Sequence, residues 1–320
     1  MAQPLNSLIG GEKIHRLGLG TFGHGDAYGG ITKEESFEIL RLASDNIPEG
    51  AKAILDTAPK YGHGKVEEWV GEFAKDNKNN FLIATKGGRH IESGRVNEKD
   101  FSPKFLRQDL ENSLSRLGLK QIFLYQLHNP SLEIIRKGDV FGILEKFRKE
   151  GKIKWYGVSI DEPIEGVSSI EMCKNKRYTG LVSIQAIYNI LNKKASQLMF
   201  KKAAESKIAI IAREVLLRGF LTGKYNESHD FSNAPEAVKK EIQLYGKYRL
   251  FKNIENVKNL LAEHNISMTQ GAISFALSNP FITTSLIGVN RISYFDEDWD
   301  STELDLPQKL IAELNDIRDI

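Results

Sequence analysis

The feature that most constrains the fold of this chain is a regular alternation between short apolar runs and amphipathic helical patterns. The apolar residues in the runs are consecutive, as expected for strands buried on both faces. Most runs begin about 25 to 35 residues after the previous one, the length of one strand–helix unit. The eight candidate strands are residues 17–21, 53–56, 81–85, 122–127, 153–159, 181–185, 208–212 and 284–287.

Helix signals occupy the segments between these strands. Ser102 followed by Pro103 fits an N-cap with proline at the first helical position. The pattern over 140–150 ends at Gly151, a typical residue just after a helix C-terminus. Residues 194–206 repeat apolar positions at helical spacing. Strands and helices therefore alternate along the whole chain.

Eight such units without a flexible linker predict an α/β fold, one closed (β/α)8 TIM barrel forming a single domain over residues 1–320. The alternative, a doubly wound open sheet, predicts a G-x-G-x-x-G phosphate loop between an early strand and a helix. Residues 18–23 match that pattern by letters, but they span the first expected strand. The barrel is preferred. Residues 9–16 are expected to form a short N-terminal β-hairpin with Gly10-Gly11 at its turn, closing the barrel floor.

Composition excludes several classes of protein. A net charge of +2, from 44 Lys and Arg against 42 Asp and Glu, gives no sign of a nucleic-acid-binding or membrane-binding face. No run approaches the roughly 18 apolar residues of a membrane span, and the N-terminus does not resemble a signal peptide. Cys173 is the one cysteine and cannot form an internal disulfide, so we expect a cytoplasmic protein. The sequence does not indicate an oligomeric state.

Polar side chains stand at the ends of three consecutive expected strands. In a (β/α)8 barrel the active site lies at the C-terminal ends of the strands. The second strand ends in Asp56 and its loop carries Tyr61, the third ends near Lys86, and the fourth leads into His128. Each residue by itself could serve as a cap, a turn residue or a solvated side chain. Together they predict a catalytic site on one rim.

These four groups suit proton transfer to a carbonyl oxygen. A phenol with its usual pKa of about 10 is a weak acid near neutral pH. An ammonium about 4 Å away interacts with a phenolate by about 4 kcal/mol at an effective dielectric of about 20, so Lys86 is expected to lower the pKa of Tyr61. Asp56 is expected to keep Lys86 charged. Neutral His128 is expected to hydrogen-bond the substrate oxygen while its carbon gains a hydride.

With these residues in place, the chain resembles the aldo-keto reductase family from about residue 15 to about residue 300. The family's Asp, Tyr, Lys and His tetrad falls on Asp56, Tyr61, Lys86 and His128. The resemblance implies NAD(P)H-dependent reduction of an aldehyde, ketone or sugar to an alcohol, or the reverse, with Tyr61 as general acid. The matching segments are LGLGTFG (17–23), LDTAPKYGHGKVEE (55–68), IATKGG (83–88), YQLHNP (125–130), YGVSI (156–160), SIQAIYNIL (183–191), RGFLTGKY (218–225) and IGVNR (287–291).

The resemblance also implies a nicotinamide cofactor that extends across the barrel mouth without a Rossmann domain. By matched position, Ser159 and Gln185 hold the carboxamide, and the guanidinium of Arg213 takes the place of a stacking aromatic ring. The other implied cofactor-binding residues are Gly20, Thr21, Asp56, Leu216, Arg218, Gly219, Leu221, Lys224, Gly288, Asn290, Arg291 and Asp298. The implied substrate-binding residues are Phe22, Tyr61, His128 and Arg89.

The chain departs from the family pattern at the adenosine end of the implied cofactor site. Ile287, Tyr294 and Asp298 stand where the family usually has Pro, Gln and Asn. Arg291 can meet a 2′-phosphate, whereas Glu297 and Asp298 oppose one. NADPH is favoured over NADH.

Other interpretations use the same residues differently. The fold can serve a non-catalytic nicotinamide-nucleotide-binding regulatory or partner subunit, although binding alone does not require a tuned phenol. Lys86 could form a Schiff base, as in an aldolase-like or pyridoxal-phosphate barrel. No metal site is predicted, because the histidines near the expected loops do not form an H-x-H or H-E-x-x-H arrangement. These histidines are His24, His63, His90 and His128.

The sequence leaves the identity of the small carbonyl or sugar substrate open. Loops supply most substrate contacts in this kind of fold. The loop after Lys86 carries Arg89, His90 and Arg95. These basic side chains could bind sugar hydroxyls, a carboxylate or a phosphate, or they could face water.

Overall fold

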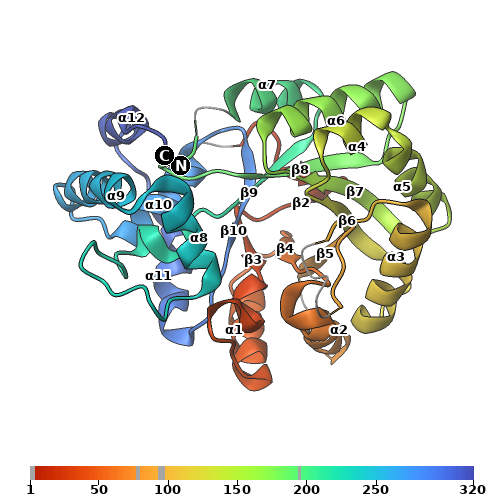
Figure 1. The fold of residues 1–320 in the computed structure, drawn as a ribbon, viewed down its shortest axis with the longest axis horizontal. Coiled ribbons are helices and arrows are strands. Elements are labelled where there is room, and N and C mark those ends of the chain that lie inside the picture. The colour runs from red at the N-terminus through yellow and green to blue at the C-terminus, as the bar shows by residue number, and fades with distance from the viewer. Residues whose placement is uncertain (1–3, 77–79, 93–97, 194–195) are drawn as a thin grey trace.

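The computed structural model describes residues 4–76, 80–92, 98–193 and 196–320. Its centre is a closed barrel of parallel strands in the order β10-β3-β4-β5-β6-β7-β8-β9, with the helices arranged around it (Figure 1). The predicted (β/α)8 fold is confirmed, and each expected strand is present with ends shifted by at most two residues. Strands β3 to β10 are Leu17–Gly20, Ala53–Asp56, Phe81–Gly87, Ile122–His128, Ile153–Ser159, Leu181–Ile187, Ala209–Arg213 and Ile282–Ile287.

Helices α1 to α12 are Lys33–Asp45, Lys65–Asp76, Pro103–Leu117, Leu132–Lys137, Asp139–Lys149, Pro163–Lys176, Gln197–Glu205, Glu236–Tyr245, Lys247–Ala262, Met268–Ser278, Phe295–Asp300 and Gln308–Asp316. Ser102 caps α3 through its side chain, with proline at the first helical turn as predicted. The helix predicted over 140–150 is α5. The helix predicted over 194–206 is α7, and residues 194 and 195 lie outside the described residues.

The connection between β9 and β10 is the longest in the barrel. It carries a 3-10 segment, η5 (Leu217–Thr222), and then α8, α9 and α10. Helices α8 to α11 gather on one side of the barrel (Figure 1). No helix of the described residues is long and apolar enough to cross a membrane.

A short hairpin closes the floor of the barrel, as predicted. Strand β1 (Leu8–Ile9) pairs antiparallel with β2 (Glu12–Lys13). Gly10 and Gly11 form the turn with φ of 58° and 88°, which suits the glycine-rich type I′ hairpin. The hairpin is shorter than predicted, because Ile14 leaves it to bridge to Lys52. Ile9 and Ile14 pack into one apolar cluster with strand residues that include Ile54, Phe123, Leu124 and Ile211.

The main apolar core lies between the strands and the surrounding helices. Because apolar side chains fill both this layer and the barrel floor, the polar residues of the strands collect at the opposite rim. The strand register brings them level with one another. Lys86 on β5 pairs with Gln126 on β6, His128 on β6 pairs with Ser159 on β7, and Ser159 pairs with Gln185 on β8.

Candidate active site

Three of the four predicted catalytic side chains meet at the C-terminal rim of the barrel. The Nζ atom of Lys86 donates to Oδ2 of Asp56 at 2.5 Å and to the hydroxyl of Tyr61 at 3.1 Å. A third bond runs from the same Nζ to the carbonyl oxygen of Thr57 at 3.1 Å. Asp56 and Lys86 are only 3% and 1% exposed. The three N–H groups of the ammonium therefore meet three fixed acceptors, which sets the position of its charge.

Asp56 is held by more than the lysine. Its Oδ1 accepts hydrogen bonds from the side-chain amides of Gln126 at 3.1 Å and Gln185 at 2.8 Å. Ser159 donates its hydroxyl to Gln185 Oε1 at 3.3 Å, which fixes the second glutamine. Gln126 was not among the predicted site residues. Its position two residues before His128 on one strand places both on the same face, and this spacing was a usable signal.

The turn that carries Tyr61 has a defined backbone. Tyr61 begins the 3-10 segment η3 (Tyr61–Gly64), in which Gly62 and His63 adopt left-handed φ values of 56° and 55°. The Tyr61 ring meets the ring of Phe22 edge-on, with centroids 5.2 Å apart. Glu67, buried in the first turn of α2, accepts from Thr85 at 2.6 Å and from an arginine of α3 at 2.7 Å. These bonds hold the turn against β5.

The electrostatics of the rim differ in one respect from the prediction. Burial raises the pKa of Tyr61 above its usual value, and Lys86 opposes this only in part because Asp56 acts against its charge. The expected lowering of the pKa of Tyr61 is therefore wrong in this structure, since burial favours the neutral phenol. Tyr61 is protonated at neutral pH, as a proton donor must be.

Lys86 and His128 behave as predicted. Burial works to lower the pKa of Lys86, but Asp56 and Tyr61 outweigh it, so the pKa is raised and the ammonium persists. Burial lowers the pKa of His128 well below its usual value, and the positive charges of Lys86 and Arg89 lower it further. His128 is therefore neutral near pH 7.

A cavity of about 910 Å³ opens above these residues. Tyr61, Lys86 and His128 line its inner end, and Asn290 and Asp298 line another part of its wall. The predicted site residues on this wall are Gly20, Phe22, Asp56, Tyr61, Lys86, Arg89, His128, Ser159, Gln185, Arg213, Leu216, Arg218, Gly219, Lys224, Gly288, Asn290 and Asp298.

Three residues predicted to bind cofactor do not line the cavity. The Thr21 side chain is buried and donates to the carbonyl oxygen of Asp56 at 3.0 Å. Leu221 is fully buried in the apolar core, because the irregular backbone of η5 turns it inward. Arg291 is exposed outside the wall. Their predicted roles in cofactor binding stay predictions.

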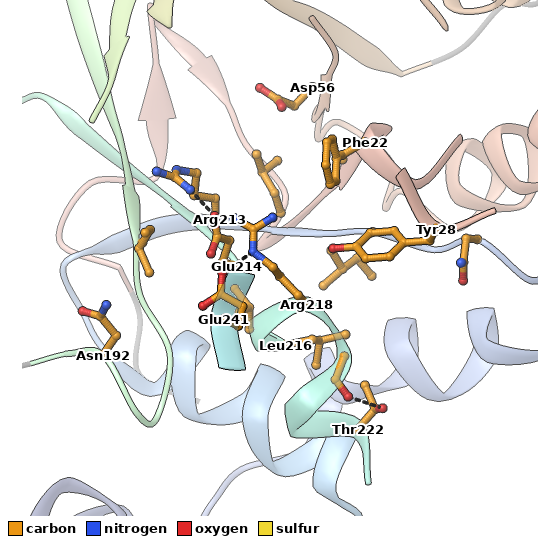
Figure 2. Close-up of a pocket in the computed structure, with 18 of the residues that line it drawn as sticks. Phe22, Tyr28, Asp56, Asn192, Arg213, Glu214, Leu216, Arg218, Thr222 and Glu241 are labelled. Carbon is orange, nitrogen blue, oxygen red and sulfur yellow. Dashed lines mark hydrogen bonds and ion pairs between the residues drawn. The ribbon is translucent and has the colours of Figure 1, made fainter. Parts of the chain in front are cut away.

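A chain of alternating charges crosses the cavity wall. Arg213 pairs with Glu214 and donates to Asp161 at 3.1 Å. Arg218 donates to Glu214 at 2.9 Å and to Glu241 of α8 at 2.5 Å. Figure 2 shows Arg218 beside the two glutamates, with the Tyr28 ring nearby. Glu241 and Tyr28 were not among the predicted site residues, since neither lies at the end of a barrel strand.

Asp298 offers a test of the electrostatics at the adenosine end of the implied cofactor site. Burial, reinforced by Glu297, raises the pKa of Asp298 to about 7. Its ordinary value is 3.8. An acid whose pKa is raised on folding costs stability that grows as pH rises from the unfolded to the folded value. The stability of Asp298→Asn relative to wild type is therefore expected to increase by about 3 kcal/mol as the pH rises from 5 to 8.

Urea unfolding of both proteins across this pH range measures the difference. Asp45→Asn, at an exposed position in α1, controls for the loss of a surface carboxylate. A stability difference between Asp298→Asn and wild type that stays constant with pH would contradict a raised pKa at Asp298.

The closed barrel and the polar rim at its C-terminal end are the architecture of a (β/α)8-barrel enzyme. The model of the aldo/keto reductase family matches residues 16–319, nearly the whole chain. The chain therefore belongs to the aldo/keto reductase family and is an NAD(P)-dependent oxidoreductase. The family resemblance stated from the sequence is confirmed.

Individual relatives agree with this assignment over nearly their full lengths. The chain is 26% identical to the NADP(+) aldo-keto reductase yakc of Schizosaccharomyces pombe, covering 97% of this chain and 90% of that protein. It is 24% identical to a D-threo-aldose 1-dehydrogenase from a Pseudomonas species, covering 96% and 95%. A glycerol dehydrogenase structure from Gluconobacter oxydans superimposes with a TM-score of 0.77 at 25% identity, covering 94% and 90%.

Proposed function

We propose that this protein reduces the carbonyl group of an aldehyde, ketone or sugar to an alcohol, or catalyses the reverse reaction, with Tyr61 as general acid. The observation that carries the proposal is the hydrogen-bonded group of Asp56, Lys86 and Tyr61 at the inner end of the cavity. The names of the yeast and Pseudomonas relatives support this choice of substrate class.

Each residue of the group has a distinct task in this proposal. The Tyr61 hydroxyl donates its proton to the carbonyl oxygen as the oxygen gains negative charge. Lys86 stabilises the phenolate that results, and Asp56 holds the ammonium in place through the 2.5 Å contact. Neutral His128 donates a hydrogen bond to the same oxygen and orients the substrate. A nicotinamide dinucleotide, when bound, would supply the hydride.

The cavity wall fits an extended dinucleotide. Ser159 and Gln185 lie on it with their side chains oriented by a mutual hydrogen bond, and they would hold the carboxamide. Arg213 would lie against the nicotinamide ring, and Arg218 and Lys224 would face the pyrophosphate. Other wall residues would complete the site: Gly20, Leu216, Gly219, Gly288, Asn290 and Asp298.

We favour NADPH over NADH as the dinucleotide. Support comes from the NADP(+) specificity in the name of the yeast relative and from Arg291, which is exposed next to the wall residue Asn290. An exposed guanidinium can bind a 2′-phosphate at the surface. Fluorescence titration with both dinucleotides tests the choice, and tighter binding of NADH would reverse it.

Glu241 is expected to weaken dinucleotide binding. The Oε1 atom of Glu241 accepts a hydrogen bond from Arg218, which leaves this guanidinium less free to bind a pyrophosphate. The Oε2 atom is buried without a hydrogen-bond partner in the described part of the chain. Glu241→Gln removes a negative charge from the proposed pyrophosphate site while keeping an acceptor for Arg218. We expect the Kd for NADPH to fall about fivefold, since one charge near the site is worth about 1 kcal/mol.

Isothermal titration of Glu241→Gln measures this effect. Glu236→Gln, at an exposed position in the first turn of α8, is the matched control and should leave the Kd unchanged. An unchanged or larger Kd in Glu241→Gln would place the pyrophosphate elsewhere.

The proposed function is tested by following absorbance at 340 nm with NADPH and NADH against a panel of aldehydes, ketoses and aldoses. Consumption of either dinucleotide that depends on a carbonyl compound supports the proposal. Dinucleotide binding without turnover across the panel would favour the alternative, a non-catalytic regulatory or partner subunit on the same fold.

Further proposals follow from the sequence alone. We propose that residues 1–320 act as a single barrel domain and that the protein works in the cytoplasm, as its one cysteine suggests. We also propose that its partner in the reaction is a small molecule and that it binds neither nucleic acid nor membrane, since its charges are balanced.

A further inference from the structure

Strand β5 continues into a segment that folds beside the cavity mouth. Residues 88–92 and 98–100 form this segment, here called the arm. Arg89 and Lys99 face each other in an antiparallel bridge, flanked by backbone hydrogen bonds from His90 to Glu98 and from Asp100 to Gly88, both of 3.1 Å. Arg95 of the same loop lies outside the described residues. The backbone of Arg89 is thus fixed from both sides.

The neighbours of Arg89 on the arm are anchored to the barrel wall. The amide of Gly88 donates to Asp109 of α3 at 2.9 Å. The His90 ring lies against Phe105, with centroids 4.3 Å apart, so this histidine packs away from the cavity. Arg89 itself lines the cavity together with Tyr61 and His128. The arm therefore presents its arginine, and not its histidine, to the proposed reaction centre.

The guanidinium of Arg89 differs from the other two arginines of the wall. Arg213 and Arg218 each pair with carboxylates. Within the described residues, the Nε atoms of Arg89 and Arg213 are both buried without a hydrogen-bond partner, but Arg213 already pairs with Asp161 and Glu214 through its other nitrogens. A buried guanidinium N–H without an acceptor is costly, and an anionic ligand supplies the missing acceptor.

A second cation stands on the same wall. Lys60 immediately precedes Tyr61 and lines the cavity. Burial lowers the pKa of Lys60. The four charges that act on it most strongly are all positive and lower the pKa further: Arg89, Lys240, Arg218 and Lys99. This part of the mouth concentrates positive charge.

The carboxylates of this part of the wall are Asp161 and Glu162. Asp161 already accepts hydrogen bonds from Asn129 and from Arg213, and Lys99 lies 4.0 Å from it. Asp161 also attracts Arg89, but burial outweighs this attraction and lowers the pKa of Arg89, so the shared carboxylate compensates the Arg89 guanidinium only in part. A ligand that brings negative charge to this side of the mouth meets net attraction.

We propose that the physiological substrate carries an anionic group, a carboxylate or a phosphate, that binds Arg89 and Lys60 while its carbonyl lies against Tyr61 and His128. This inference rests on the proposed carbonyl reduction and specifies its substrate class. A guanidinium offers two parallel N–H donors that match either anion. The anion would thus orient the substrate as well as attract it.

The test compares anionic and neutral carbonyl compounds of matched shape. We would measure kcat/KM at 340 nm for 4-carboxybenzaldehyde against 4-carbamoylbenzaldehyde, and for glyceraldehyde 3-phosphate against glyceraldehyde. The two pairs separate a carboxylate preference from a phosphate preference. The wild type is expected to favour at least one anionic member by about 30-fold, equivalent to about 2 kcal/mol. Rising salt concentration should reduce that preference.

Arg89→Gln is expected to abolish the preference, so that the ratio of kcat/KM for the anionic and neutral members falls about 30-fold. Arg41→Gln is the matched control, because Arg41 is 63% exposed on α1 and does not line the cavity. It should keep the wild-type ratio.

The outcomes separate this inference from the proposed function. If the wild type reduces the neutral and anionic members of both pairs equally well, or if Arg89→Gln keeps the anionic preference, the substrate-class inference is wrong while carbonyl reduction stands. If the wild type turns over neither these four compounds nor the broader carbonyl panel, the proposed function fails, and this inference fails with it.

Discussion

Replacement of Tyr61 by Phe is expected to lower kcat for carbonyl reduction by about 10³- to 10⁴-fold while dinucleotide binding changes little. The variant keeps the ring that packs edge-on against Phe22 and removes only the hydroxyl that Lys86 contacts at 3.1 Å. A positioned general acid typically contributes about 10²- to 10⁴-fold to the rate. The upper part of that range applies here because the neighbouring ammonium also loses the phenolate it would stabilise.

Steady-state kinetics and a dinucleotide titration on the same preparation of Tyr61→Phe give both quantities. Tyr178→Phe supplies a matched control, since Tyr178 precedes β8 and does not line the cavity. A turnover number within tenfold of wild type would remove Tyr61 from the role of general acid. Loss of dinucleotide binding would show instead that the hydroxyl shapes the cofactor site.

Replacement of Lys86 by Met is expected to reduce both activity and stability. The variant leaves the buried carboxylate of Asp56 without its ammonium partner, and breaking a buried ion pair in this way typically costs about 3 to 5 kcal/mol. The phenol also loses the cation that stabilises its conjugate base, so kcat is expected to fall at least about 10²-fold. Urea unfolding and steady-state kinetics measure the two effects.

Two further variants separate the causes. Lys193 is another buried lysine, paired with Asp319 at 3.0 Å and away from the cavity wall, so Lys193→Met should lose stability without a comparable loss of kcat. The double variant Asp56→Asn, Lys86→Met removes both charges and should recover part of the stability lost in Lys86→Met. A double variant less stable than Lys86→Met would argue against an unpaired carboxylate as the cause.

Much of the fold is predictable because a barrel strand is buried on both faces. Strands such as β4 and β9 are short and apolar at consecutive positions, which distinguishes them from half-exposed strands. Their ends are less certain, because polar residues such as Lys86 and His128 still belong to strands while they face the rim. The long connection between β9 and β10 has no counterpart in the simple strand–helix repeat.

The inner part of the site is predictable for the same reason. Asp56, Lys86 and His128 lie at strand ends, and barrel closure alone brings strand ends together. Glu241 and Tyr28 reach the cavity from α8 and from the 3-10 segment η2 (Asp26–Tyr28), and their approach depends on loop geometry. Leu221 shows the opposite case, because an irregular turn directs this motif residue into the core and away from the cavity wall.

The sign of the pKa change at Tyr61 illustrates a further limit of sequence reasoning. Spacing alone indicates that an ammonium lies near the phenol, but the balance between burial and charge depends on how far the folded chain buries Tyr61 and Lys86. In the folded protein Asp56 offsets much of the charge of Lys86, so burial decides the direction of the pKa change. Lys86 therefore acts on the phenolate formed during the reaction more than on the resting acid.

The central claim is that a proton from Tyr61 and a hydride from a bound dinucleotide meet at one carbonyl group in this cavity. The most direct measurement is a single turnover with dinucleotide deuterated at the transferring position of C4, with mass spectrometry of the alcohol, for wild type and Tyr61→Phe side by side. We predict that the wild type places the label on the former carbonyl carbon and that the variant, equally loaded with dinucleotide, transfers almost none in the same time. Equal label in both products, or an unlabelled alcohol from the wild type, would contradict the claim.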